Sequence, residues 1–248
     1  MGWRSAGGDG AGDRQGTRGP DPCVARGVAG VTPAEVLRAT LEVSIFVDEL
    51  FGENCFLIRR RDTSAALVID PGLQLERVRQ QLRADNLQVD RILITHGHID
   101  HIAGVSGLQV ETGAPIAMHP EDLAIIDWDQ LGQLRFTPDG FAPFSIDTPL
   151  AHDVTLPFQD LSLRVLHTPG HTEGSVCFVF GLDCFAGDTL FQRGIGRTDL
   201  PGGDMRKIVF SIRRVLYALP PKTLVYPGHG PRTSIEEERL LNPFVPAG

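Results

Sequence analysis

Three histidines and an aspartate lie within six residues of one another, directly after a short apolar run. The run is Ile-Leu-Ile at residues 92–94, and the polar residues are His96, His98, Asp100 and His101. A buried strand that ends in a tight turn would bring these side chains together. Packing three imidazoles and a carboxylate into one turn is costly unless a cation binds them. The segment therefore predicts a metal site at a strand end, in preference to a solvated histidine-rich loop.

Three further segments place a histidine or an aspartate where an apolar run ends. His171 lies in a turn rich in glycine and proline, Asp188 follows residues 184–186, and His229 follows residues 223–226. Each of these residues alone is weak evidence for a metal site, since a histidine or aspartate at a strand end is more often a turn or capping residue. Together with the first cluster they make five imidazoles and two carboxylates. That set is enough for two metal ions with open positions, and nitrogen and oxygen ligands without thiolate suit zinc, iron or manganese.

The rest of the pattern alternates apolar strands with amphipathic helices. Strands are expected at residues 41–47, 55–58, 65–69, 91–95, 115–118, 161–166, 175–180, 184–186 and 223–226. Helices are expected at residues 73–84, 102–112 and 204–216, and residues 127–149 form an irregular stretch that could be a lid or a partner surface. The first three strands suggest a meander. Together, these strands and helices predict an α/β domain whose sheets are covered by helices.

Composition narrows the class of protein further. Residues 1–38 are mostly Gly, Asp, Arg and Pro, which predicts a disordered leader or a translation artefact, and residues 39–248 are expected to form one domain. The 31 acidic and 23 basic residues give a net charge of −8, which disfavours nucleic acid and anionic membranes as partners. With no apolar run of about 18 residues and no C-x-x-C pair, the expectation is a cytoplasmic protein.

Four motifs in fixed order carry a family resemblance. T-H-x-H-x-D-H, T-P-G-H-T-x-G-S, G-D and P-G-H-G resemble the metallo-β-lactamase superfamily from about residue 41 to the C-terminus. The resemblance implies an αβ/βα sandwich of two mixed β-sheets flanked by helices. Within the superfamily, residues 194–203 (G-I-G-R-T-D-L-P-G-G) and 238–244 (E-R-L-L-N-P-F) are similar to short, bacterial-type glyoxalase II (hydroxyacylglutathione hydrolase) proteins.

The resemblance also implies a ligand set for two divalent metal ions, with zinc as the first expectation and iron or manganese as alternatives. The first ion would be held by His96, His98 and His171. The second would be held by Asp100, His101 and His229, and Asp188 would bridge the two.

The resemblance to glyoxalase II implies hydrolysis of a small-molecule thioester such as S-lactoylglutathione. Two metals that share a water lower its pKa from 15.7 to about 7, which gives a bridging hydroxide nucleophile at neutral pH. Asp100 would orient that nucleophile or accept its proton, and the thiolate leaves without compulsory protonation. Arg197 could bind a substrate carboxylate, or it could instead pin its own loop through Asp199 or Asp204.

Other functions share these motifs. A persulfide dioxygenase would use His96, His171 and Asp188 as a mononuclear iron site, although P-G-H-G-P at residues 227–231 looks more like the hydrolases. The metal motif is also compatible with a lactonase function, whereas the acidic net charge disfavours a nuclease. A binding module with purely structural metal is disfavoured because all seven ligand positions are filled. His119, His152 and His167 match no ligand motif and are expected in turn or supporting positions.

Overall fold

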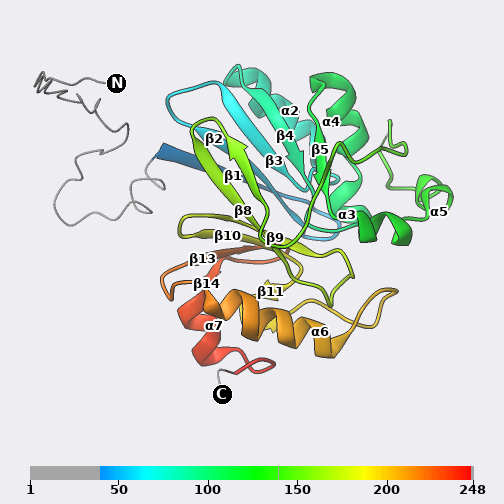
Figure 1. Cartoon of the computed structure of the whole chain (residues 1–248). Helices are drawn as coiled ribbons and strands as arrows, with labels where there is room; N and C mark the ends of the chain where they lie inside the picture. Colours follow the sequence, from blue (N-terminus) through cyan, green and yellow to red (C-terminus); the bar gives the residue numbers. More distant parts are fainter. Residues whose placement is uncertain (1–39, 139, 247–248) are drawn as a thin grey trace, which may run out of the picture. The chain divides into compact units, whose positions relative to one another are not determined.

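The computed structural model describes residues 40–138 and 140–246 (Figure 1). The leader predicted at residues 1–38 lies outside this described part of the chain. The first sheet contains six strands that neighbour one another in chain order: β1 (Leu41–Val47), β2 (Asn54–Arg60), β3 (Ala65–Ile69), β4 (Gln88–Leu93), β5 (Ile116–Met118) and β6 (Thr148–Pro149). The first three are antiparallel, as the predicted meander requires, and β3 to β6 are parallel, so the sheet is mixed.

The second sheet is also mixed. Its strand order is β14 (Thr233–Ser234), β13 (Leu224–Pro227), β10 (Asp183–Gly187), β9 (Val176–Phe180), β8 (Leu161–His167) and β7 (Thr155–Phe158). The β10–β13 pair is parallel and the other pairs are antiparallel. A separate small hairpin pairs β11 (Leu190–Phe191) with β12 (Gly194–Ile195).

Helices connect these strands. The first half carries α2 (Leu75–Ala84), α3 (Ile99–Ile102), α4 (Val105–Thr112), the 3₁₀ turn η1 (Pro120–Ile125) and α5 (Trp128–Gly132). The second half carries α6 (Met205–Phe210), which runs on through a π turn η2 (Ser211–Val215) and a 3₁₀ turn η3 (Leu216–Ala218), and then α7 (Ile235–Leu241). None of the described helices is both long and apolar enough to cross a membrane.

Alternating side chains along the buried strands build three apolar cores. On β2, Phe56 and Ile58 enter a central core that also contains Phe178 of β9, so this core lies between the two sheets. The intervening Leu57 packs into a second core with α2 and α4, whereas Cys177 of β9 packs into a third with α6 and α7. Strands buried on both faces have continuous apolar sequences, which explains the runs seen in the sequence. The described chain is therefore the predicted αβ/βα sandwich, and Figure 1 shows its helices outside the two sheets.

Several short elements differ from the sequence expectation. The strand β7, which pairs with β8, was not predicted, because Pro157 and the short length of β7 hide it. The small strands β11 and β12 have only two residues each and leave no periodic signal. The stretch predicted as irregular at residues 127–149 contains α5 and β6.

Candidate metal centre

The predicted ligands lie on segments that follow strands of both sheets. After β4, His96 and His98 lie in a loop and Asp100 and His101 in α3. The others lie in loops that follow β8, β10 and β13, in chain order His171, Asp188 and His229. Two backbone hydrogen bonds join the sheets at this edge: the Val176 N–H donates to the Thr95 carbonyl oxygen (2.9 Å), and the Asn54 N–H donates to the Gly228 carbonyl oxygen (2.7 Å). The structure thus brings together all seven side chains that the sequence singled out.

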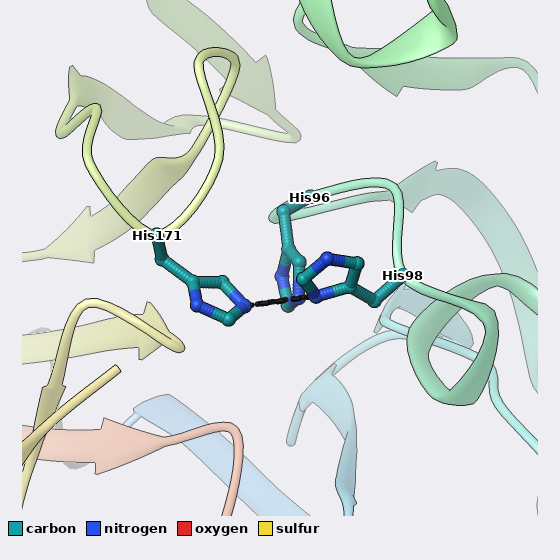
Figure 2. Close-up of side chains that lie close together, drawn as sticks. All are labelled: His96, His98 and His171. Atoms are coloured by element: carbon teal, nitrogen blue, oxygen red, sulfur yellow. Dashed lines mark hydrogen bonds between the residues drawn. The ribbon is translucent and has the colours of Figure 1, made fainter. Parts of the chain in front are cut away.

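Three imidazoles form a first group, shown in Figure 2. His96 Nε2 lies 3.1 Å from His98 Nδ1 and 3.2 Å from His171 Nε2, and His98 Nδ1 lies 2.9 Å from His171 Nε2. Nitrogens bound about 2.0–2.1 Å from a tetrahedral ion lie about 3.3 Å apart. The spacing of these three nitrogens is therefore close to what one ion would impose.

A second group contains Asp100, His101 and His229. Asp100 Oδ2 lies 3.2 Å from His229 Nε2 and 3.8 Å from His101 Nε2. The His101 side chain is fully buried, whereas the His229 side chain is 27% exposed. This group combines nitrogen with oxygen donors and is open to solvent on the His229 side.

Asp188 lies between the two groups. Its Oδ1 is 3.5 Å from His101 Nε2, and its Oδ2 is 3.5 Å from both His171 Nε2 and His229 Nε2. Gly228 makes this approach possible, since a Cβ there would overlap Asp188 Oδ1. One carboxylate thus faces donor atoms of both groups at once.

Backbone carbonyls orient two of the rings. His171 Nδ1 donates to the Arg197 carbonyl oxygen (2.8 Å), and His229 Nδ1 donates to the Phe51 carbonyl oxygen (3.1 Å). Because a carbonyl oxygen only accepts, each neutral ring carries its proton on Nδ1. The lone pair of each Nε2 is then directed into the cluster.

Asp70 and Thr95 orient two more rings. The Thr95 hydroxyl donates its proton to Asp70 Oδ2 (2.6 Å), so its oxygen accepts from His96 Nδ1 (3.0 Å). Asp70 Oδ2 also accepts from His101 Nδ1 (2.9 Å). Such outer hydrogen bonds fix the tautomer of metal-ligating histidines and raise their basicity. His96 and His101 consequently direct their Nε2 atoms into the cluster.

The cluster contains unsatisfied donor atoms that a cation would satisfy. With both rings protonated on Nδ1, the 3.2 Å contact between the Nε2 atoms of His96 and His171 holds no proton. His101 Nε2 and Asp188 Oδ1 are buried and have no hydrogen-bond partner among the described residues. Buried polar atoms without partners are rare and costly. The histidines and aspartates therefore form a cluster suited to binding metal.

Electrostatics within the cluster favour neutral imidazoles at the first group. Burial lowers the pKa of His98 to about 4 and that of His171 to about 3, and it lowers the pKa of His96 well below its ordinary value. Burial also acts to lower the pKa of His101, but the carboxylates of Asp100, Asp188 and Asp70 outweigh it and raise that pKa well above the usual range. The carboxylates thus attract positive charge to the His101 position, which a metal ion would supply.

A cavity of about 540 Å³ opens onto the cluster. His98, Asp100, His171, Asp188 and His229 all contribute to its lining. A volume between about 300 and 1,000 Å³ is typical of small-molecule sites. Members of both groups are therefore accessible to one ligand.

Comparison with known proteins places this geometry in a family. The profile described as "Metallo-beta-lactamase superfamily" matches residues 48–229, which include all seven clustered side chains. The chain belongs to the metallo-β-lactamase superfamily. A curated relative, hydroxyacylglutathione hydrolase GloC of Haemophilus influenzae, is 33% identical over 209 residues, covering 83% of this chain and 98% of the relative. The chain is thus a member of a metallo-hydrolase superfamily with a glyoxalase II relative.

Two solved members of the superfamily are similar across most of the chain. One is ETHE1 from Myxococcus xanthus, with 31% identity and a TM-score of 0.70, covering 82% of this chain and 84% of that one. The other is TTHA1623 in a di-iron-bound form, with 34% identity and a TM-score of 0.71, covering 82% of this chain and all of that one. The two-sheet fold thus agrees with both solved structures, one of which is in a di-iron-bound form.

Two aspartates that support the histidine and aspartate cluster through hydrogen bonds were not predicted from the sequence. Asp70 is fully buried and accepts from the Thr95 backbone N–H (2.7 Å) in addition to its side-chain bonds. Asp122, also fully buried, accepts from the Gly97 N–H (2.8 Å), the Gly174 N–H (2.6 Å) and the Thr172 hydroxyl (2.8 Å). Asp122 therefore ties the loop of His96 and His98 to the loop of His171. Its partners lie 25 to 52 residues away in sequence, so no local pattern marks its role.

Arg197 lines the cavity, but its guanidinium already has a partner. Its Nε and one terminal nitrogen lie 2.8 Å and 2.7 Å from the two carboxylate oxygens of Asp199. This is the loop-pinning arrangement considered from the sequence, with Asp199 as the partner. The Arg197 carbonyl oxygen, as described above, holds the ring of His171.

His119 and His167 form a stacked pair apart from the cluster. Their ring centroids are 4.3 Å apart with an interplanar angle of 7°. Their nitrogens have protein partners, since His119 Nδ1 accepts from the Glu121 N–H (3.4 Å) and His167 Nε2 donates to the Glu173 carbonyl oxygen (2.7 Å). The ligand atoms of this pair and of Glu121 lie within 4.8 Å of one another, but one nitrogen of each ring is already hydrogen-bonded to the backbone.

Proposed function

We propose that this chain is a metal-dependent thioester hydrolase that holds two divalent ions. His96, His98 and His171 would hold one ion, Asp100, His101 and His229 the other, and Asp188 would bridge them. The observation that carries the proposal is the placement of Asp188, whose two oxygens face donors of both groups at 3.5 Å. The identity of the ions is proposed as zinc, with iron or manganese compatible with the same nitrogen and oxygen donors.

The side chains have distinct roles in the proposed reaction. When bound, a pair of divalent ions supplies a water of lowered pKa at neutral pH and polarises a carbonyl oxygen. Asp100 lines the cavity and has Oδ2 3.2 Å from His229 Nε2, and we propose that its carboxylate orients the attacking water or accepts its proton. A thiolate leaves without needing an acid. A leaving group that needs no acid suits this cavity, because its described lining residues other than the proposed ligands include no Asp, Glu, Lys, Tyr or Cys.

The glyoxalase II relative supports a thioester as the substrate class. GloC of Haemophilus influenzae carries the name hydroxyacylglutathione hydrolase and matches nearly its whole length to this chain. S-lactoylglutathione is therefore the first substrate to assay. A lactonase would use the same centre, and only a parallel assay with lactones separates the two.

One competing function is an oxygen-dependent persulfide dioxygenase with a single iron, which the motifs of the chain also resemble. That enzyme would use His96, His171 and Asp188 and would leave the second group without an ion. Without a second ion, His101 and His229 would have to carry a proton on Nε2 to pair with the carboxylates of Asp100 and Asp188. The two-ion hydrolase instead gives these four side chains a metal-binding role, and for this reason we favour it.

Metal analysis combined with two assays tests the proposal. The purified protein is expected to contain about two metal ions per chain and to release thiol from S-lactoylglutathione under argon. The same preparation is given glutathione persulfide while oxygen consumption is followed. Rapid oxygen uptake, one iron per chain and no thioester cleavage would show that the dioxygenase function is correct instead.

A further inference from the structure

The cavity over the cluster is walled by large apolar side chains from separate segments. Phe51 comes from the β1–β2 turn, Leu131 from α5, Ile125 from η1, Phe191 and Ile195 from the β11–β12 hairpin, and Leu200 from the loop before α6. Phe51 packs edge-on against Phe136, with centroids 5.2 Å apart, and is still 42% exposed. A ligand that fills this cavity therefore buries its surface mainly against apolar atoms.

Positive charge in the cavity wall is confined to one side chain that is already paired with a carboxylate. Among the described residues that line the cavity, Arg197 is the single lysine or arginine. Its guanidinium makes the two-point ion pair with Asp199 described above. Because Arg197 lowers the pKa of Asp199 to about 2, this partner stays charged at neutral pH. The wall therefore offers a substrate carboxylate one cationic side chain, for which it would compete with Asp199.

We propose that the site prefers thioesters whose thiol portion is apolar and uncharged over thioesters of glutathione. Glutathione carries two carboxylates and an ammonium group, and recognition of carboxylates ordinarily uses arginine or lysine. An aryl or alkyl thiol instead gains free energy by burying apolar surface against the Phe51, Leu131 and Phe191 walls. This inference rests on the proposed hydrolase function, because it names the class of substrate for the same site.

Three thioesters with the same lactoyl group test the preference. Their thiols are glutathione, benzyl mercaptan and the small neutral N-acetylcysteamine, so charge and apolar area vary separately. The expected kcat/KM is at least about tenfold higher for the benzyl ester than for the glutathione ester, with the N-acetylcysteamine ester between them. Equal values, or a preference for the glutathione ester, would overturn the inference.

A charge placed in the wall sharpens the test. Leu131→Arg adds a cation to the cavity lining and is expected to lower the benzyl-to-glutathione ratio of kcat/KM about tenfold. Leu131→Gln removes the same apolar side chain without adding charge, and Val110→Arg adds the same charge at a residue outside the lining that is 86% exposed. An equal drop in the ratio for Leu131→Arg and Val110→Arg would contradict a local effect.

A conservative surface variant covers the case in which Leu131→Arg fails to fold. Asp199→Asn releases the guanidinium of Arg197 and is expected to shift the ratio in the same direction by a smaller factor. An unchanged or increased benzyl-to-glutathione ratio in a folded Asp199→Asn protein would count against the inference.

Binding measurements separate this inference from the hydrolase proposal. Thioethers that match the benzyl and glutathione esters, with a methylene in place of the carbonyl, are titrated calorimetrically into the protein with and without added zinc. If no ester is cleaved but the benzyl thioether binds more tightly, the hydrolase proposal fails and the preference stands. If the glutathione thioether binds as tightly or more tightly, the preference is wrong whatever the enzyme cleaves.

Discussion

The two groups of proposed ligands differ in charge and in access. His96, His98 and His171 contribute nitrogen atoms 2.9 to 3.2 Å apart, and His96 and His171 are each 1% exposed. The group of Asp100, His101 and His229 adds a carboxylate and is 27% exposed at His229. The first group is neutral and held tightly by its surroundings, whereas the second attracts a cation by charge at the mouth of the cavity. We therefore expect the second ion to exchange more readily than the first.

The largest expected effect comes from removing the residue that couples the groups. Asp188→Ala is expected to lose both ions and to reduce thioester hydrolysis by about 10³-fold or more, because its carboxylate faces both groups. Elemental analysis of the purified variant checks the metal content. Asp199→Ala, which removes an exposed carboxylate that does not face the cluster, is the matched control and should keep both ions. Unchanged metal content in Asp188→Ala would refute the bridging role.

A pair of histidine variants compares the groups directly. His171→Ala and His229→Ala are each expected to retain about one ion per chain and to lose about 10²-fold in activity. The ion left in His171→Ala, held by the more open group, should be removed faster by a chelator than the ion left in His229→Ala. Stopped-flow removal of cobalt(II), followed by its visible absorption, measures the two rates. The opposite order of rates would show that exposure does not govern exchange.

A smaller effect is expected at Asp122, which supports only the first group. Asp122→Asn keeps the size but cannot accept from the two backbone N–H groups and the Thr172 hydroxyl as the carboxylate does. Affinity at His96, His98 and His171 is expected to fall about 10- to 100-fold while affinity at the other group is nearly unchanged. Competition with a chelating indicator gives both constants. Equal losses at both groups would mean that Asp122 supports the fold in general.

The smallest effect is expected for Thr95→Val. This change removes the hydroxyl that accepts from His96 Nδ1 and donates to Asp70. Because one net hydrogen bond contributes about 1 kcal/mol, affinity of the first group for metal should fall about fivefold. The same competition measurement applies. A loss larger than that of Asp122→Asn would reverse the relative importance given to these two supports.

Much of the fold could be predicted from the sequence, because strands buried on both faces leave continuous apolar runs. Residues 65–69 are the clearest case, since Ala-Ala-Leu-Val-Ile forms β3 with the predicted bounds. The elements that escaped prediction are those whose pairing is not local. The strand β6 has two residues and forms only by pairing with β5, about 30 residues earlier in the chain.

In the candidate site, too, the residues that are close in sequence could be predicted and those that depend on distant contacts could not. His96, His98, Asp100 and His101 are close in sequence, so their convergence follows from a single turn after a strand. His171, Asp188 and His229 were singled out by their positions at strand ends, but their assignment to the two ions required the family resemblance, because their approach depends on two sheets packing face to face. Asp70 and Asp122 were missed because their roles consist of hydrogen bonds to distant loops. The paired state of Arg197 likewise depends on the geometry of its bidentate contact with Asp199, which composition and spacing alone do not determine.

The most direct test of the central claim is a crystal structure of the metal-loaded protein with anomalous diffraction recorded at the absorption edge of the bound metal. We predict two anomalous peaks per chain, one on each side of the Asp188 carboxylate, separated by about 3.5–4 Å. A single peak bounded by His96, His171 and Asp188, with the nitrogens of His101 and His229 bound to no ion, would contradict the account.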